Sequence, residues 1–429
     1  MTYEETTKFL FEQLPMYQRQ GKSAYKANLN TTLELDKYFD HPHTHYKTIH
    51  IAGTNGKGSV SHMLASILMQ AGYKTGLYTS PHLKDFRERI KVNGQKIPEA
   101  EVVSFVEENK NIIEKLKPSF FEMTAAMAFE YFRKAKVDIA VIEVGMGGRL
   151  DSTNIITPEI SVITNIGLDH TQFLGNTKAL IAKEKAGIIK QNIPVVIGET
   201  DPETIEVFRE RAKEKNAPLI QADKLYRIPF SAFSHDNKQI MQVYSGDEVK
   251  HKGLKVSLSG WYQKKNTVTV LATTEALKTK GYKVEKEDIY RGLENVQEET
   301  GLLGRWQIIG HNPRIICDTG HNGAGVREIV EQLRNTPYQN LHMIWGMVND
   351  KDITAVLKML PKDAVYYFTR ASIPRSLDER ILYEKAQKFG LKGKHYPDVK
   401  TSLNEAKKNA TPNDLIFIGG STFIVADII

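Results

Sequence analysis

The chain has 429 residues, of which 41% are hydrophobic and 25% charged, a balance typical of a globular protein with two or three domains. Its formal charge of +7 is modest, and no dense basic stripe is interleaved with aromatics, which argues against nucleic-acid binding. The single cysteine, Cys317, excludes an intrachain disulfide, and the polar start and short apolar runs predict neither secretion nor membrane insertion. We therefore expect a cytoplasmic protein.

The first half of the chain alternates short β-branched apolar runs with helical patterns. Near-continuous apolar runs separated by helices are typical of a parallel sheet that is buried on both faces. The runs begin at Lys47, Val137, Glu159 and Ile193, and helical patterns cover residues 59–69 and 123–133.

Residues 224–260 alternate polar and apolar side chains and contain turn residues, which predicts a small antiparallel sheet packed on the main one. A second series of parallel-type strands then begins at Pro313 and continues from Leu341, Ala364 and Asp414. This series indicates a smaller, Rossmann-like α/β domain. We predict a first domain over residues 1–297, a linker over 298–312 and a second domain over 313–429.

The stretch HIAGTNGKGSVS, residues 50–61, lies between a predicted strand and a predicted helix. It departs from the common phosphate-loop pattern G-x-x-x-x-G-K-[ST], because Gly58 separates Lys57 from Ser59. Glycines there let backbone N–H groups face an anion, Lys57 can reach a phosphate, and Ser59 can bind Mg²⁺. The alternative is a plain glycine turn, but the order of strand, glycines, lysine, serine and helix favours phosphate binding.

Further polar residues follow predicted strands. Ser80 precedes a proline, Glu143 ends an apolar strand, and His170 follows the next strand. Ligands bind at the carboxyl ends of strands in α/β sheets, so these side chains are candidate metal ligands. The alternatives are an ordinary Ser-Pro loop, a buried salt bridge and a core histidine. Residues 181–190 place lysines beside the same edge, and Asp318 and His321 are expected to face outward from the edge of the second sheet.

These motifs occur in the order TNGKGS, TSPHL, EVGMGGRLDSTN, GLDHT, KEKAGI, GR and DTGHN. This order resembles the bifunctional folylpolyglutamate synthases and dihydrofolate synthases of bacteria, the folate branch of the Mur ligase superfamily. The resemblance spans residues 29–421 and implies an N-terminal phosphate-loop ATPase domain and a C-terminal glutamate-ligase domain. It implies ATP and Mg²⁺ as cofactors, and dihydropteroate, reduced folates and L-glutamate as substrates. We expect the protein to be a monomer.

The resemblance also implies residue roles. The ATP-binding positions are Gly56, Lys57, Gly58, Ser59, Val60, Asn266, Arg305 and Asp318. Magnesium would be held by Ser59, Ser80, Glu143 and His170. Lys57, His321 and Lys185, which matches a carbamylated lysine, would be catalytic, and closure of the domains would complete the site. The folate-type substrate would contact Leu29, Ser119, Phe121, Leu150, Asp151 and Ser152.

The sequence departs from the family in its second half. Asp318-Thr319-Gly320-His321-Asn322 replaces the common Asp-Gly-Ala-His-Asn, and Leu-Gly-Arg replaces Pro-Gly-Arg, although the polar positions remain. Alternatives to a bifunctional enzyme are a folylpolyglutamate synthase alone, a peptidoglycan Mur ligase, a phosphotransferase or NTP switch, and a non-catalytic nucleotide-binding module. The short stretch before Gly53 disfavours the peptidoglycan ligase, which usually carries a nucleotide-sugar domain there.

Overall fold

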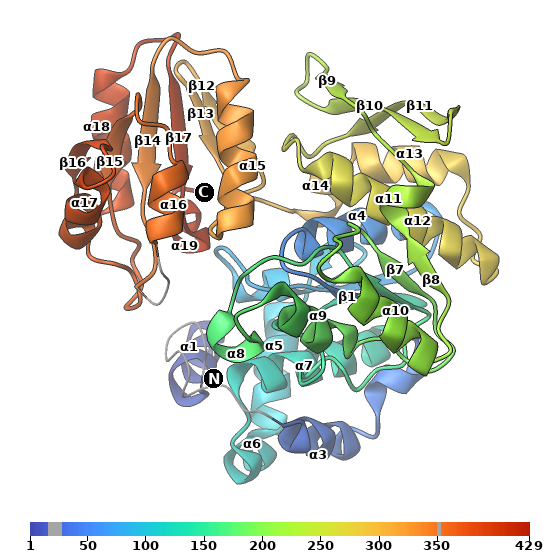
Figure 1. Cartoon of the computed structure of the whole chain (residues 1–429). Helices are drawn as coiled ribbons and strands as arrows, with labels where there is room; N and C mark the ends of the chain where they lie inside the picture. Colours follow the sequence, from blue (N-terminus) through green and yellow to red (C-terminus); the bar gives the residue numbers. More distant parts are fainter. Residues whose placement is uncertain (16–27, 350–352) are drawn as a thin grey trace. The chain divides into compact units, whose positions relative to one another are not determined.

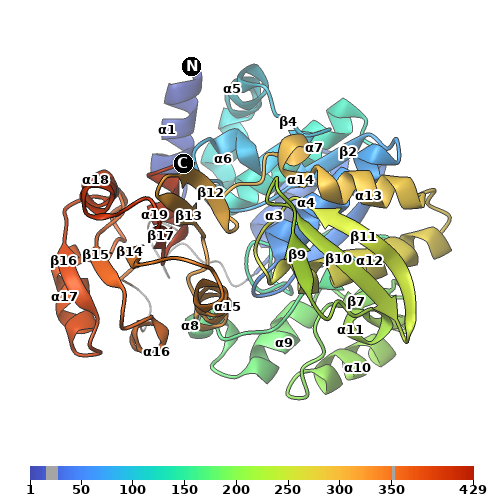
Figure 2. The ribbon, with the colours of Figure 1, turned by 90° about the horizontal axis from the view of Figure 1, so that it is seen from above.

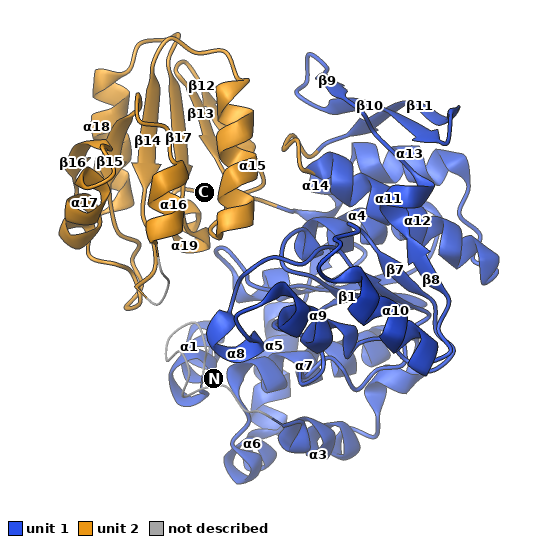
Figure 3. Cartoon of the chain, in the orientation of Figure 1, with its two compact units in different colours: residues 1–257, 263–302 blue, residues 258–262, 303–429 orange. Residues whose placement is uncertain are grey.

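The computed structural model describes residues 1–15, 28–349 and 353–429, and within these residues the strands form sheets of eight, three and six strands (Figure 1). Two compact units divide the chain (Figure 3). Unit 1 is residues 1–257 and 263–302, and unit 2 is residues 258–262 and 303–429. The units change after Leu302, within the range 298–312 that we assigned to a linker; the predicted domain roles stay predictions. Among the described residues, no helix has the length and apolar character needed to cross a membrane.

Unit 1 contains the eight-stranded sheet in the order β4-β3-β2-β5-β1-β6-β7-β8. Its strands are β1 (Lys47–Ala52), β2 (Thr75–Tyr78), β3 (Ile90–Val92), β4 (Gln95–Lys96), β5 (Ile139–Glu143), β6 (Ile160–Ile163), β7 (Val195–Ile197) and β8 (Leu219–Gln221). The pairs from β2 to β8 are parallel, whereas β3 and β4 pair in antiparallel fashion. The long helices that accompany them are α4 (Lys57–Gln70), α7 (Phe120–Ala135), α9 (Lys178–Ala186), α10 (Ile205–Glu214) and α12 (Gln263–Thr279).

The strand order reverses direction at β1, which makes β1 the topological switch point of the sheet. The crossover from β1 through α4 leads to β2 on one side, whereas β6 leads through α9 and α10 to β7 and β8 on the other. Because such crossovers are right-handed, helices on connections that run in opposite directions cover opposite faces of the sheet. Loops at the carboxyl end of β1 therefore border a crevice of the kind in which α/β proteins bind ligands.

Shorter helices complete unit 1. These are α1 (Tyr3–Gln13), α3 (Asn30–Tyr38), η2 (Pro42–His45), η3 (Phe86–Arg89), α5 (Glu99–Glu108), α6 (Lys110–Leu116), α8 (Thr171–Leu174), α11 (Ala222–Leu225), α13 (Lys286–Glu294) and α14 (Val296–Thr300). Phe129 and Phe132 of α7 belong to the same buried core as Ala140 and Ile142 of β5, and a Cβ on Gly76 of β2 would lie 3.0 Å from the Phe132 ring. Burial of this apolar surface fixes α7 on the sheet.

The small antiparallel sheet has the order β11-β10-β9, with strands β9 (Ser231–Phe233), β10 (Gln239–Ser245) and β11 (Glu248–Val256) (Figure 2). The prediction of this sheet is confirmed, but its packing differs from our expectation. It lies on α13: the Tyr290 hydroxyl donates to the Lys252 carbonyl at 3.2 Å, and the Ser257 amide donates to the Leu293 carbonyl at 3.1 Å. Most side chains of β11 are exposed, and Leu254 and Val256 are buried. The small sheet therefore has one apolar face, and the amphipathic helix α13 covers it.

Unit 2 holds the six-stranded sheet in the order β12-β13-β17-β14-β15-β16. Its strands are β12 (Gln307–His311), β13 (Arg314–Cys317), β14 (Leu341–Trp345), β15 (Val365–Phe368), β16 (Lys392–His395) and β17 (Leu415–Gly419), and only β12 is antiparallel. Its helices are α15 (Gly323–Arg334), α16 (Thr354–Met359), α17 (Glu379–Gln387), α18 (Val399–Asn409) and α19 (Thr422–Ala426).

The two faces of this sheet pack in separate cores. Ile316, Met343 and Tyr366 face α15, α16 and α17, whereas Ile344 and Tyr367 face α18 and α19. Since strand side chains alternate between faces, a central strand such as β17 must be apolar on both faces, as the sequence predicts, whereas the edge strand β16 is largely polar and exposed. The predicted fold class, a mostly parallel sheet with a small antiparallel sheet and a smaller C-terminal α/β domain, is confirmed.

Candidate active site at the carboxyl edge of the unit 1 sheet

The phosphate-loop segment turns closely against neighbouring side chains between β1 and α4. Gly53 has φ +148°, and a Cβ there would lie 1.8 Å from the Thr164 hydroxyl oxygen. Gly56 has φ +84°, and its Cβ would lie 2.3 Å from Asn266 Oδ1. Both positions therefore require glycine. Helix α4 begins at Lys57, directly after this glycine turn. The free amides at the N-terminus of α4 therefore lie next to the turn, where they can bind an anion.

Two lysines converge on the carbonyls of this loop. Lys57 Nζ donates to the carbonyls of Gly53 at 3.1 Å and Thr54 at 3.3 Å, and Lys185 Nζ donates to Gly53 at 2.7 Å. Lys185 is 4% exposed, and burial, followed by the charge of Lys57, lowers its pKa to about 7. Lys185 therefore holds a neutral amine at a pH where an ordinary lysine is charged.

The strand order brings the other predicted metal ligands to the same edge. Ser80 follows β2, Glu143 ends β5 and His170 follows β6, and these strands lie in the order β2-β5-β1-β6 around the phosphate loop. Glu143 pairs with Ile51 of β1 and is 3% exposed. The Ser80 amide donates to Glu143 Oε2 at 2.9 Å, so the structure places Ser80 and Glu143 together.

Ser59 lies in the first turn of α4 and is 1% exposed. Its hydroxyl accepts a hydrogen bond from Gln263 Nε2 at 3.3 Å, and Gln263 Oε1 accepts one from Asn266 Nδ2 at 2.7 Å. These two hydrogen bonds connect the start of α4, next to the phosphate loop, to the first turn of α12. The sequence motifs point to Asn266 but not to Gln263, three residues earlier on the same helix face, and not to Thr164.

His170 lies at the start of α8 with a left-handed backbone, φ +51°, and its amide donates to Asp169 Oδ1 at 2.9 Å. The segment before it is anchored to the phosphate loop. Thr54 Oγ1 donates to the Gly167 carbonyl at 3.1 Å, and the Gly167 amide donates to Thr54 Oγ1 at 2.9 Å. The loop that carries His170 is thus held beside the phosphate loop.

The residues at this edge fit a nucleotide phosphate and a magnesium ion. The two glycines whose Cβ atoms would collide with neighbours form a cradle of bare backbone, which suits close approach by an anion. Magnesium prefers oxygen ligands, which the Ser59 hydroxyl and the Glu143 carboxylate can supply. The assignment of Ser59, Ser80, Glu143 and His170 as metal ligands stays a prediction.

The predicted substrate positions Ser119 and Phe121 lie at the start of α7. Ser119 is the N-cap of that helix: its Oγ accepts from the Glu122 amide at 3.2 Å, and its own amide donates to Glu122 Oε2 at 2.6 Å. The Phe121 ring lies beside Tyr78, with centroids 5.9 Å apart, and a Cβ on Gly145 would lie 2.4 Å from its edge. Phe121 is therefore positioned against the loop that follows β5.

The Leu150, Asp151 and Ser152 positions lie on that same loop. Asp151 is 6% exposed and accepts hydrogen bonds from the amides of Met146 at 2.9 Å and Thr153 at 3.0 Å. Burial nevertheless raises the pKa of Asp151. Leu29 precedes α3, where its carbonyl accepts from Leu33 at 2.8 Å, and its described contacts do not link it to the other predicted substrate residues.

We expected Asp318 to face outward from the edge of the second sheet, but its side chain is buried within unit 2. It is 2% exposed, and its carboxylate accepts hydrogen bonds from the Tyr262 hydroxyl at 2.6 Å, the Trp306 amide at 2.8 Å and the Gly320 amide at 2.7 Å. The segment that precedes β12 needs these partners for its buried amides. The sequence motifs do not point to Tyr262, although it begins the stretch YQKKN, residues 262–266, that ends at the predicted ATP-binding residue Asn266.

Arg305 and His321 meet at Thr319 in unit 2. Arg305 donates to the Thr319 hydroxyl, and His321 Nδ1 lies 3.0 Å from the Thr319 carbonyl. The structure therefore clusters Arg305, Asp318 and His321 within unit 2, and their roles toward ATP stay predictions.

Replacing Asp318 by asparagine is expected to destabilise the protein by about 1–3 kcal/mol, because the new amide nitrogen cannot accept from all the buried donors. Thermal unfolding of the full chain should show a lower Tm, whereas Asp363→Asn, an exposed position of unit 2, should leave it unchanged. An unchanged Tm in the Asp318 variant would contradict this role.

Two protein-family models match this chain, one mainly over unit 1 and the other over unit 2. Residues 51–274 match the Mur ligase middle domain, and residues 304–422 match the Mur ligase glutamate ligase domain. The dihydrofolate synthase/folylpolyglutamate synthase of Bacillus subtilis is 32% identical over 95% of this chain and 95% of its own. The chain belongs to the dihydrofolate synthase/folylpolyglutamate synthase family of Mur ligases.

Other members of this family resemble the chain over its whole length. The structure of Escherichia coli FolC in complex with DHPP and ADP is 28% identical with a TM-score of 0.85, covering 100% of this chain and 97% of that one. A bifunctional folylpolyglutamate synthase/dihydrofolate synthase with Mn, AMPPNP and L-glutamate bound has a TM-score of 0.83 at 28% identity, covering 100% of this chain and 97% of that chain. A probable bifunctional folylpolyglutamate synthase/dihydropteroate synthase of Haloferax volcanii is 32% identical over 100% of this chain, which spans 50% of its length.

Proposed function

We propose that the protein joins L-glutamate to dihydropteroate, forming dihydrofolate, and to the γ-glutamyl tails of reduced folates, with hydrolysis of ATP to ADP and phosphate. The observation that carries this proposal is the convergence of Lys57 and Lys185 on the Gly53 carbonyl, beside the Glu143 strand end. A nucleotide-binding module that performs no chemistry would not need a second, buried lysine with a lowered pKa at its phosphate loop.

In the proposed reaction, the substrate carboxylate attacks the γ-phosphoryl group of ATP and forms an acyl phosphate, and the amine of glutamate then displaces phosphate to form an amide. The amides at the start of α4 and the Lys57 ammonium bind the phosphoryl oxygens and stabilise their charge. A magnesium ion, when bound, supplies further charge neutralisation through the Ser59 and Glu143 oxygens. No protein nucleophile is needed, so positioning supplies most of the rate.

Lys185 is proposed to act as a carbamate. Only the neutral amine attacks CO₂, and burial keeps the pKa of Lys185 near 7, so that about half of it is neutral at that pH. The amine forms an N–C bond to CO₂, one C=O bond opens to a carboxylate and a proton is released to solvent, so an anionic carbamate would stand beside the predicted metal ligands and could orient their shell.

The assay that tests the proposal supplies ATP, magnesium, glutamate and one acceptor, either dihydropteroate or a reduced folate. We expect phosphate release that depends on glutamate with both acceptors, and mass spectrometry should find each product heavier by one glutamyl residue. Release with the reduced folate alone would leave a folylpolyglutamate synthase, and release with neither acceptor would refute the ligase.

We further propose that the protein works as a cytoplasmic monomer that binds neither nucleic acid nor membranes. The modest net charge supports the part of this proposal that concerns nucleic acid. Light scattering coupled to size exclusion should give the mass of one chain, 48.6 kDa.

A further inference from the structure

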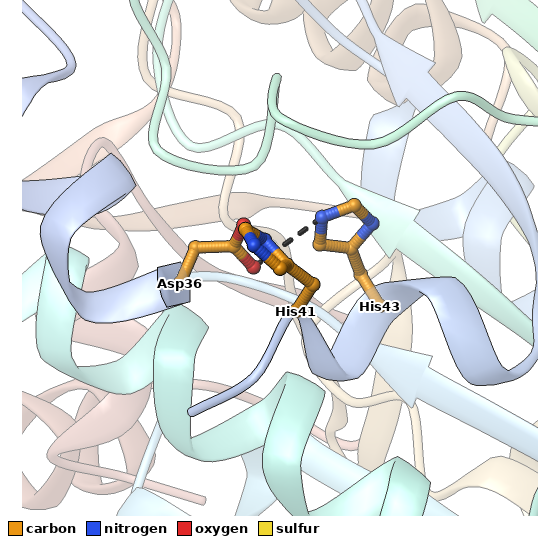
Figure 4. Close-up of side chains that lie close together, drawn as sticks. All are labelled: Asp36, His41 and His43. Carbon is orange, nitrogen blue, oxygen red and sulfur yellow. Dashed lines mark hydrogen bonds and ion pairs between the residues drawn. The ribbon is translucent and has the colours of Figure 1, made fainter. Parts of the chain in front are cut away.

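A cluster of one carboxylate and two imidazoles lies in unit 1, between the end of α3 and the start of β1 (Figure 4). Asp36, His41 and His43 each direct one possible ligand atom toward the others, and these atoms all lie within 4.8 Å of one another. None of the three residues belongs to the site at the phosphate loop. From this geometry we propose that Asp36, His41 and His43 form a binding site for a divalent transition metal, with zinc as the ion that fits best.

The local fold builds the cluster from eight consecutive residues. Asp36 lies in the last turn of α3, and the chain then reverses through Asp40 and His41, whose φ angles are +58° and +52°. The His41 amide donates to the Asp36 carbonyl at 2.8 Å, which holds the reversed chain over the helix end. Pro42 starts η2 and is buried, so the backbone that carries His43 is fixed.

The Asp36–His43 distance matches that between two ligands of a tetrahedral ion, whereas Asp36 and His41 are hydrogen-bonded and would have to move apart to admit one. His43 Nε2 lies 3.3 Å from Asp36 Oδ1, and His41 Nδ1 lies 2.5 Å from Asp36 Oδ2. Two ligands of one tetrahedral zinc lie roughly 3.3 Å apart, because zinc–ligand bonds are about 2.0–2.1 Å long. The His43 side chain is 13% exposed and its ring packs edge-on against Phe129, whereas His41 is 54% exposed and can rotate to admit an ion.

A second observation points to a ligand at this place. Asp36 is 7% exposed, and its Oδ1 is buried without a hydrogen-bond partner among the described residues, although His43 Nε2 is only 3.3 Å away. A buried carboxylate oxygen that accepts no hydrogen bond is costly unless a cation neutralises it, and the His43 imidazole can do so only when it is protonated. A metal ion bound between Asp36 Oδ1 and the two imidazoles would satisfy it.

The chemistry of the three ligands selects the ion. Imidazole nitrogens favour zinc and its neighbours in the first transition row, whereas magnesium and calcium prefer all-oxygen sites. Three protein ligands leave one position for water, so the ion would sit at a partly open site. It would fasten the end of α3 to η2, one residue before β1 leads toward the phosphate loop.

The experiment uses the tag-free full chain, stripped with a chelator and dialysed against zinc without nucleotide, and counts bound zinc by mass spectrometry. We expect the wild type to bind one zinc more than the His41→Ala/His43→Ala double variant. His45→Ala is the matched control, because His45 lies exposed on the same short helix outside the cluster, and it should bind as the wild type does. Zinc held at the predicted magnesium site would contribute equally to every variant.

Two further measurements separate a metal site from a plain ion pair. With excess magnesium present to occupy the predicted magnesium site, zinc should raise the Tm of the wild type and of His45→Ala by more than that of His41→Gln, which changes only the exposed ligand. Cobalt should give the visible absorption of a tetrahedral site only where zinc binds. Equal zinc content in the wild type and the double variant, or an equal shift of Tm in His41→Gln, would overturn the proposal.

Discussion

Replacing Gly56 by alanine is expected to lower kcat/KM for ATP by about 10²–10³-fold, comparable with the loss of a main donor to a developing oxyanion. Its Cβ would lie 2.3 Å from Asn266 Oδ1, and Asn266 is buried and bonded to Gln263, so it cannot simply move aside. The loop must shift instead, which turns its amides away from the phosphates. Steady-state kinetics and nucleotide titration would measure the effect.

Gly72 provides a matched control for that variant. It has the same φ as Gly56, +84°, but a Cβ there would meet no described atom within 4 Å. Gly72→Ala therefore carries the same backbone strain, about 1–2 kcal/mol, without the collision. We expect a lower Tm and unchanged kinetics. If both variants lost activity alike, strain rather than close packing at Gly56 would be the cause.

Replacing Lys185 by alanine is expected to lower kcat by about 10–100-fold, as the loss of a group that orients metal ligands does in other sites. Added bicarbonate should not restore the variant, because it has no amine to carbamylate. The wild type, in contrast, should lose activity in CO₂-depleted buffer and regain it with bicarbonate. The regain should become faster as the pH rises through about 7, where the pKa of Lys185 lies.

Lys183→Ala is the control for this experiment, because Lys183 lies exposed on the same helix, α9. It should keep full activity and the same response to bicarbonate. Full activity in Lys185→Ala would remove the carbamate role while leaving the ligase assay untouched. Lys185→Ala could also lose activity while CO₂ depletion leaves the wild type unaffected. Lys185 would then act by holding the phosphate loop through its hydrogen bond to the Gly53 carbonyl, and not as a carbamate.

The strands and the phosphate loop could be predicted because their signals are local. A buried parallel strand is apolar on both faces, as β7 and β17 are, and a loop that must bring bare backbone to an anion needs glycine at Gly53 and Gly56. The packing of the small sheet on α13 and the inward turn of Asp318 could not be predicted, because both depend on partners distant in sequence.

The sequence alone determined the fold class, the phosphate loop and the family, because apolar periodicity and ordered motifs are written in consecutive residues. Only the tertiary structure decided which of those residues meet. It placed Lys185 on the carbonyl of Gly53, 132 positions away, and joined Gln263 to Ser59 across 204 positions. It also placed His41 and His43 against Asp36 by a chain reversal with two left-handed residues, a conformation that no hydrophobic pattern specifies.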